Sequence, residues 1–326
     1  MLRLPLCNPK SNRLVLKRSH NSVVGDTVTL RCERVDVFLR HAKHDLLSTV
    51  EWTKDGIVVA RYNKKGTNVD WWVSDARQEL NHQNFLLKIH QSQEADSGEY
   101  SCHVTLTDAK AKLDWQPPEH IQLTVIGPPS EPGRAVVASF TSRSAIISWK
   151  PATTHQDAPI IQYVVVVSIG KEHEPYKEVY TMGNETTTVV SGLVPYTIYS
   201  FHVLAKNIAG RSAPGKPSFA IRTKGEVPSA PPVIKHIYNS SNASVVITWD
   251  HPPEASLHGP LVGYRIVARG LSSDVVRRDY YVPSADRTSY ELTGLSVYAK
   301  YLITLEADNN YGYSPPDSVR ILTDEG

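Results

Sequence analysis

Apolar and polar residues alternate along much of this chain, and one long alternating stretch occurs twice. Residues 193–212 place apolar or small side chains at every second position from Tyr199 to Ala205, and residues 295–314 repeat this spacing 102 positions later. A period of two is typical of a β-strand with one buried face. A repeat of about 100 residues is too long for a solenoid and suits a small all-β domain. The pattern therefore predicts two copies of one β-sandwich.

Further motifs recur in both copies. Alternating apolar residues lead to Trp149 and, 100 residues later, to Trp249; a Pro-hydrophobic-x-x-Tyr step follows at residues 159–163 and 260–264. With the Leu-x-Pro-x-Thr-x-Tyr and Asn-x-x-Gly motifs within residues 193–212, these features resemble the fibronectin type III domain. The second copy departs from the family pattern, because it has Val297 and Ala299 where the family prefers Pro and Thr. The resemblance implies the same sandwich for both copies.

The first third of the chain carries a different signature. Residues 96–102 read Asp-Ser-Gly-Glu-Tyr-Ser-Cys, and Cys32 and Trp52 precede them. This arrangement resembles the immunoglobulin domain, with Tyr100 in the position of the tyrosine corner. The resemblance implies a disulfide between Cys32 and Cys102 that joins two sheets beside the Trp52 indole. Four alternating residues supply the inward faces of two further strands: Val28, Leu30, Leu87 and Ile89.

We therefore expect an all-β protein made of three tandem β-sandwiches. The expected domains are an immunoglobulin-like domain at 14–126 and fibronectin type III domains at 129–224 and 228–324. The 70 residues between the two paired cysteines exceed what a compact immunoglobulin domain needs, so we expect an insertion at residues 34–50 and additional strands at 61–77. Proline-rich joints follow the first and second domains and favour a semi-rigid arrangement.

Composition excludes some classes of partner. The chain has 35 basic and 33 acidic residues, a net charge of +2, so it offers no electrostatic case for binding nucleic acid or an anionic membrane. It contains no apolar run of about 18 residues that would span a membrane. Both ends of the sequence look truncated, so we expect a fragment of a longer cell-surface protein whose membrane anchor lies outside the fragment.

Cysteine and asparagine usage point to the secretory pathway. Cystine bridges persist in oxidising compartments, and Asn184, Asn239 and Asn242 each begin an Asn-x-Ser/Thr sequon. All three sequons fall in predicted turns or loop edges, where a glycan would meet solvent. Cys7 is left over, and we interpret it as a thiol without a partner in this chain.

Catalytic and metal-binding motifs are missing. We find no Gly-x-Ser-x-Gly, phosphate-binding glycine loop or His-Glu-x-x-His motif, and therefore expect no enzyme activity, cofactor or small-molecule substrate. His41 and His44 have metal-like spacing, but a solvated polar loop explains them better because no ligand cluster completes the set. Residues 308–310 (Asp-Asn-Asn) resemble a fragment of a calcium-binding loop, but the full ligand pattern is absent. A turn between two strands explains them.

Trp71 and Trp72 are the most unusual local feature. Neighbours in a strand point to opposite faces, so both cannot lie in one core. Either one is exposed as an anchor for a partner, since aromatic residues are enriched at interfaces, or the second is covered by the additional strands or the insertion. We name both as candidate partner-binding residues.

An immunoglobulin domain followed by fibronectin type III repeats resembles the ectodomains of sidekick proteins, Down-syndrome cell-adhesion molecules, contactins and receptor-type tyrosine phosphatases. The resemblance implies binding to other cell-surface proteins, homophilic or heterophilic. We expect the first domain to bind and the repeats to act as spacers. The alternatives are an intracellular muscle protein of the titin or twitchin type, and the ectodomain of a receptor phosphatase or kinase.

Overall fold

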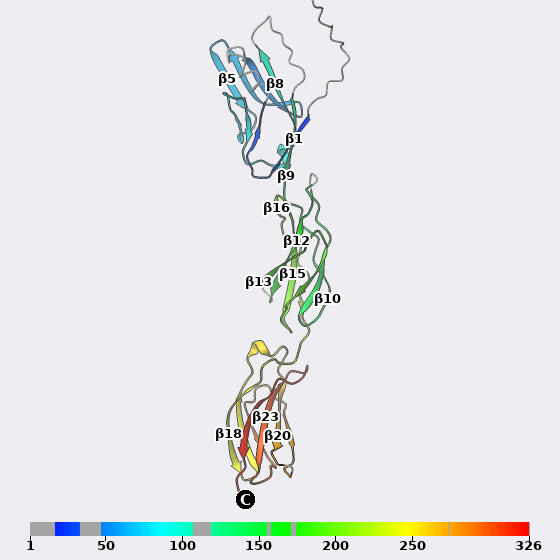
Figure 1. The fold of residues 1–326 in the computed structure, drawn as a ribbon, viewed down its shortest axis with the longest axis vertical. Coiled ribbons are helices and arrows are strands. Elements are labelled where there is room, and N and C mark those ends of the chain that lie inside the picture. Colours follow the sequence, from blue (N-terminus) through cyan, green and yellow to red (C-terminus); the bar gives the residue numbers. More distant parts are fainter. Residues whose placement is uncertain are drawn as a thin grey trace, which may run out of the picture. The chain divides into compact units, whose positions relative to one another are not determined.

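The computed structural model describes residues 17–32, 47–106, 119–154, 158–170, 174–272 and 274–325. In these residues the secondary structure consists of β-strands and two three-residue 3-10 helices, η2 (Glu94–Asp96) and η3 (Glu254–Ser256). The strands form three separate sandwiches (Figure 1), and the expected all-β class is confirmed.

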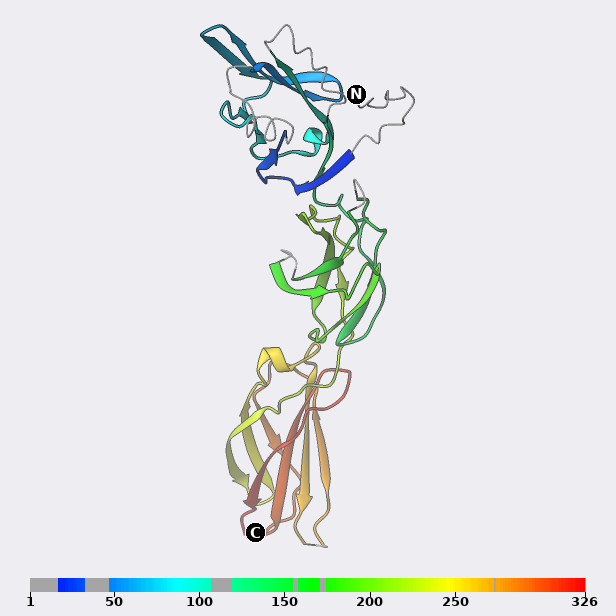
Figure 2. The same cartoon turned by 45° about the horizontal axis from the view of Figure 1, so that its top comes forward.

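The first sandwich has a larger sheet in the order β1-β9-β8-β3-β4-β5 and a smaller one in the order β2-β7-β6. Their bounds are β1 (Lys17–Val23), β2 (Val28–Leu30), β3 (Leu47–Lys54), β4 (Ile57–Lys65), β5 (Asn68–Val73), β6 (Gln78–Leu80), β7 (Leu87–Ile89), β8 (Gly98–Leu106) and β9 (Glu119–Ile126). β1, in dark blue, lies along β9 in parallel (Figure 2), whereas the other pairs are antiparallel. The additional strands expected at residues 61–77 are therefore present, as β4 and β5.

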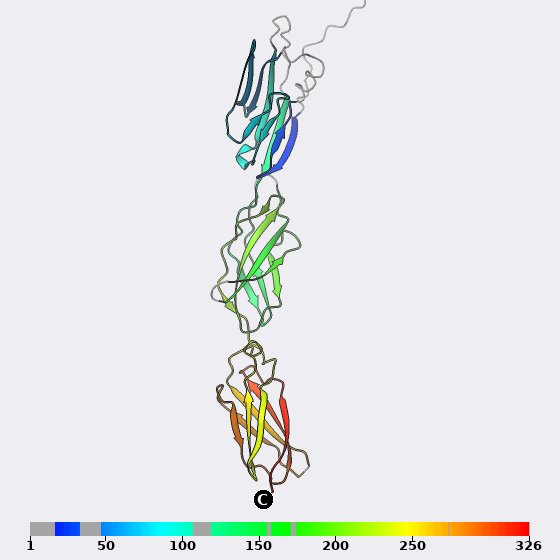
Figure 3. The ribbon, with the colours of Figure 1, turned by 90° about the vertical axis from the view of Figure 1, so that its left-hand side faces the viewer.

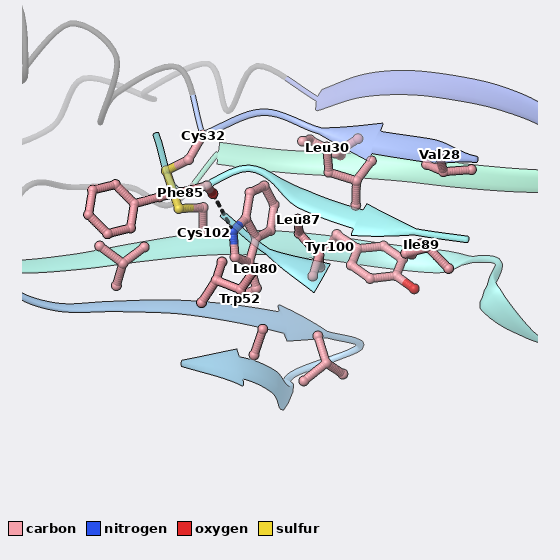
Figure 4. Packing of buried hydrophobic residues seen from close by; sticks show 14 of the residues in the cluster. Val28, Leu30, Cys32, Trp52, Leu80, Phe85, Leu87, Ile89, Tyr100 and Cys102 are labelled. Carbon is pink, nitrogen blue, oxygen red and sulfur yellow. Dashed lines mark hydrogen bonds between the residues drawn. A yellow bond between two sulfur atoms is a disulfide. The ribbon is translucent and has the colours of Figure 1, made fainter. Parts of the chain in front are cut away.

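The core of this sandwich forms around the predicted disulfide. Cys32 follows β2 of the smaller sheet, Cys102 lies in β8 of the larger sheet, and their Cα atoms are 5.9 Å apart. Trp52 is fully buried between the sheets and donates from Nε1 to the Phe85 carbonyl oxygen at 3.0 Å. Figure 4 shows this indole beside the cystine. The predicted Cys32–Cys102 disulfide is confirmed.

A partly buried ion pair lies beside the same core. The Tyr100 hydroxyl donates to the Asp96 carbonyl oxygen at 2.9 Å, which confirms the tyrosine corner. Both Asp96 carboxylate oxygens accept hydrogen bonds from Arg77, at 2.7 and 3.0 Å. The backbone N–H of Gln93 donates to the same carboxylate at 2.8 Å. This turn, which contains η2, is therefore fixed to the start of β6 by one arginine.

The second sandwich packs a sheet in the order β10-β11-β14 against one in the order β13-β12-β15-β16, with β17 also paired to β15. The bounds are β10 (Val136–Phe140), β11 (Ser144–Ser148), β12 (Gln162–Ile169), β13 (Glu174–Tyr180), β14 (Thr187–Ser191), β15 (Ile198–Asn207), β16 (Gly210–Arg211) and β17 (Ile221–Arg222). Trp149 lies edge-on to Tyr163 in its core, with ring centroids 5.3 Å apart.

The third sandwich repeats this plan. One sheet has the order β18-β19-β22 and the other β21-β20-β23-β24. The bounds are β18 (Val233–Ser241), β19 (Ser244–Asp250), β20 (Gly263–Gly270), β21 (Arg278–Val282), β22 (Ser289–Leu292), β23 (Lys300–Asp308) and β24 (Asp317–Leu322). Trp249 and Tyr264 form the matching edge-on pair at 5.0 Å. Figure 3 shows the sandwiches from the side.

The turn before β23 keeps its backbone contacts despite the departures at Val297 and Ala299. The Tyr301 hydroxyl accepts from the Ser296 N–H at 2.9 Å, as the Tyr199 hydroxyl accepts from the Val194 N–H at 3.0 Å. The N–H of Ala299 donates to the Thr323 hydroxyl at 2.9 Å, and the N–H of Thr197 does the same to Thr223. The turn tolerates the changes because tyrosine, threonine and backbone groups hold it.

The Asn-x-x-Gly motif fixes the segment that leads into each repeat. Asn207 is buried and donates from Nδ2 to the Gly127 carbonyl oxygen at 2.8 Å. Asn309 is fully buried and donates to the Glu226 and Leu257 carbonyl oxygens, both at 2.6 Å. Each asparagine oxygen also accepts from the backbone two residues on, which forms the predicted turn.

Candidate partner-binding surface

The two candidate tryptophans lie on β5, the last strand of the six-stranded sheet, at the left of the first sandwich in Figure 1. Trp71 pairs with Tyr62 of β4 and Trp72 pairs with Arg61. Directly opposed residues point to the same face, and Tyr62 belongs to the core, so Trp71 lies on the inner face and Trp72 on the outer. They are 52% and 41% exposed, so neither tryptophan is buried.

Trp71 lies at the margin of the inner face, next to the smaller sheet. Its ring stacks on His82, with centroids 5.2 Å apart and planes 26° apart. His82 follows β6, so this contact joins the margins of the two sheets. Stacking covers one ring face, and the exposed half of Trp71 remains available for a partner.

Trp72 belongs to a mainly polar outer face. Its neighbour Arg61 forms an ion pair with Glu51 of β3, with Nε and Oε1 2.6 Å apart. Glu51 in turn pairs across the sheet with the exposed His103 of β8. The outer face therefore offers one aromatic side chain beside a row of charged and polar groups.

A second polar cluster lies on the same outer face, on β8 and β9. His120 Nδ1 is 2.8 Å from the Glu99 carboxylate and 3.1 Å from the Ser101 hydroxyl. Such a face suits a partner that brings complementary polar groups, because burying these groups unpaired would be costly. It does not resemble the apolar surface of a permanent dimer.

The glycosylation candidates occupy different environments. Asn184 is exposed in a bend before β14, and Asn242 is exposed in the turn between β18 and β19. Asn239, which we expected at a turn or loop edge, lies instead within β18 and is only partly exposed. Its Nδ2 donates to the Leu322 carbonyl oxygen at 3.0 Å and to Asp324 Oδ1 at 2.7 Å. The alternation that predicted the next strand did not reveal that β18 extends this far.

Several sequence-predicted features lie outside the described residues. These are Cys7, the His41 and His44 pair, and most of the insertion at 34–50. Among the described residues, no group of three or more His, Cys, Asp or Glu side chains could hold a metal ion. No helix in that part of the chain is long and apolar enough to cross a membrane.

Comparison with known families decides the membership of the chain. The fibronectin type III domain family matches residues 129–221 and 229–323, and the immunoglobulin V-set domain family matches residues 16–126. The chain belongs to the fibronectin type III family, with a V-set domain ahead of its two repeats. A V-set domain has strands beyond those of the compact immunoglobulin domain, which accounts for β4 and β5.

Curated relatives match this chain over nearly its whole length. A protein described as receptor-type tyrosine-protein phosphatase mosPTP-1 of Aedes aegypti is 34% identical over 94% of this chain and 22% of its own length. The neural cell adhesion molecule L1-like protein of Mus musculus is 29% identical over 87% of this chain and 22% of its own. Protein sidekick-1 of Gallus gallus is 28% identical over 94% of this chain and 13% of its own length. This V-set and fibronectin type III chain thus spans less than a quarter of each of these relatives, which are adhesion or receptor proteins.

Sequence reasoning located the tryptophans but missed their surroundings. The Arg61–Glu51 ion pair and the Trp71–His82 stack join residues from different structural elements, and no local spacing marks them. The alternation within residues 57–65 could have shown that Arg61 faces outward. Only the register between strands places Trp72 beside it.

Proposed function

We propose that this chain is the recognition region of a cell-surface adhesion protein or receptor and binds another cell-surface protein through its V-set domain. The observation that carries the proposal is the pair of half-exposed tryptophans on β5. Large aromatic side chains supply much of the binding energy at protein interfaces. The relatives, whose names include a cell adhesion molecule and a receptor-type phosphatase, support a cell-surface role.

The fibronectin type III repeats act as spacers in this proposal. Their matched contacts, at Tyr199 and Tyr301 and at Asn207 and Asn309, are explained by folding alone. The domains described here supply recognition without catalysis, and the Cys32–Cys102 disulfide favours the cell surface over an intracellular muscle protein.

A cell-binding assay with single substitutions tests this assignment. The whole chain is immobilised on fluorescent beads and tested for bead aggregation and for binding to cells. We expect Trp72→Ala to weaken binding by about 2 kcal/mol, roughly thirtyfold, because an aromatic anchor is lost. Phe219→Ala is the matched control, because Phe219 is 82% exposed in the second sandwich.

Melting temperatures separate binding from folding. A Trp72→Ala chain that melts like the unchanged chain but binds less supports the assignment. The proposal is wrong if Trp71→Ala and Trp72→Ala both leave binding unchanged while Phe219→Ala reduces it.

The ectodomain of a receptor phosphatase is the second candidate. The 34% identity to mosPTP-1 over 94% of this chain favours it. Sequencing the transcript beyond Gly326 distinguishes the two candidates, because only a receptor phosphatase continues into a phosphatase domain.

A further inference from the structure

Among the described strands, β5 forms one edge of the six-stranded sheet, and this edge can accept another strand. Residues 66 and 67 form a two-residue turn between β4 and β5, and Gly66 begins it with a φ of +64°. Lys65 and Asn68 flank this turn and form a hydrogen-bonded pair. From there along the two strands, non-hydrogen-bonded and hydrogen-bonded pairs alternate. Asn68, Asp70 and Trp72 therefore direct their backbone groups toward β4. The N–H and C=O groups of residues 69, 71 and 73 point away from it, and no described strand pairs with them.

This edge lacks the protection found on comparable edges. Proteins discourage pairing at sheet edges with lysine, proline, bulges or other charges. Among the described edge strands of six or more residues, β1, β13, β18 and β24 each contain lysine or arginine, and β13 and β18 pair with register shifts. β5 reads Asn-Val-Asp-Trp-Trp-Val and pairs with β4 without a register shift. Its only charge is Asp70, so it is the edge best suited to pairing.

We propose that β5 pairs antiparallel with β5 of a second copy of this chain and joins two six-stranded sheets. The inference rests on the proposed function and names its partner as a copy of the chain itself. An antiparallel pair of identical strands obeys twofold symmetry, so one edge provides both halves of the contact. Pairing at a sheet edge supplies main-chain hydrogen bonds that give affinity, and side chains set the register.

Charge and strand length select one register. The register centred on Asp70 places two carboxylates directly opposite each other, which is destabilising. The register centred on Trp72 sets residue 69 opposite residue 75, which lies beyond the end of β5, so only residues 71 and 73 can exchange hydrogen bonds. The register centred on Trp71 pairs all of residues 69–73 with one another and sets Asp70 opposite Trp72 of the second copy. Trp71 then faces Trp71, and aromatic cross-strand pairs stabilise sheets.

Sedimentation of the whole chain tests the pairing. We expect a concentration-dependent equilibrium between monomer and dimer. Val69→Pro should abolish the dimer, because it removes a backbone N–H that points to the free edge while sparing the bonds to β4. Val69→Thr is the matched control, because it keeps the N–H and a β-branched side chain, and it should dimerise like the unchanged chain.

Cysteine cross-linking tests the register and does not depend on proline. In a Cys7→Ser background, Trp71→Cys chains should form disulfide-linked dimers on mild oxidation, since opposed Cα atoms in this register lie about 5.5 Å apart. Val69→Cys chains should not cross-link to themselves. They should cross-link to Val73→Cys chains when the two are mixed.

Three results would overturn the inference: a monomer at every concentration, equal dimerisation of the Val69→Pro and Val69→Thr chains, or cross-linking of Val69→Cys to itself in preference to Trp71→Cys. The proposed function has a separate readout. A chain that stays monomeric but still binds cells through Trp72 contradicts self-pairing and leaves recognition of a different cell-surface protein standing.

Discussion

The Asp96 carboxylate is buried at the turn before β8 and depends on one arginine. Burial raises the pKa of Asp96, but hydrogen bonds from Arg77 and from the Gln93 N–H, with the charge of Arg77, outweigh it. The net pKa lies below the ordinary value of 3.8. A carboxyl with a lower pKa in the folded state stabilises the fold above its unfolded pKa, and that contribution is lost as the pH falls below about 4.

We predict that Arg77→Ala lowers the stability of the first domain by about 2 kcal/mol at neutral pH, because it leaves a buried carboxylate without its counter-ion. The stability of the unchanged chain should fall between pH 5 and pH 3, and that of the Arg77→Ala chain should fall less. Urea unfolding at several pH values measures both effects. Arg77→Lys, which keeps the charge but loses the paired hydrogen bonds, should lie in between. Parallel pH curves for the unchanged and Arg77→Ala chains would contradict the account.

Core residues that belong to a family signature could be recognised from the sequence. Cys32, Trp52, Tyr100 and Cys102 were each placed correctly through the resemblance to the immunoglobulin domain. Arg77 was not recognised, since its partner Asp96 lies across the fold and an arginine in a polar stretch has no periodic signature. Register between strands, rather than alternation within one strand, determines such pairs.

At the scale of the element, β18 changes the expectation for glycosylation. A glycan attaches to the asparagine Nδ2, and in Asn239 this atom donates two hydrogen bonds toward the end of β24. Asn242 lies in the following turn and Asn184 lies in a bend, both exposed to solvent. The two sequons three residues apart therefore differ because the strand ends between them.

We predict glycan on Asn184 and Asn242 but not on Asn239 when the chain is made by a secretory cell. Glycosidase treatment should shift the gel mobility of the Asn184→Gln and Asn242→Gln chains less than that of the unchanged chain, by the contribution of one glycan each. The shift of the Asn239→Gln chain should equal that of the unchanged chain. Ser244→Ala is the control, because it destroys the sequon of Asn242 and leaves that asparagine in place. A mobility step lost with Asn239→Gln would contradict the prediction.

At the scale of the whole molecule, all three cysteines lie in the first third of the sequence, and the fibronectin type III repeats have none. The repeats must therefore gain their stability from packing and hydrogen bonds, without a disulfide. In the third sandwich this packing is a core of fully buried side chains around Trp249.

We predict that reduction destabilises one domain selectively. A bridge that closes 70 residues stabilises by about 4 kcal/mol, so reducing agent should lower the melting transition of the V-set domain and leave those of the repeats unchanged. Calorimetry with and without reductant measures this. The Cys32→Ala, Cys102→Ala double variant should melt as the reduced chain does and should no longer respond to reductant. A shift shared by every transition would show that the domains do not unfold separately.

The buried asparagines of the repeats bear on how such proteins evolve. Asn207 and Asn309 hold the chain that leads into their own domain by its backbone carbonyl groups, at Gly127 and Glu226. Every residue type has that carbonyl, so the contact makes no demand on the side chain that a preceding module happens to end with. A gene segment encoding one repeat can consequently be duplicated or moved behind an unrelated module and still secure its own beginning.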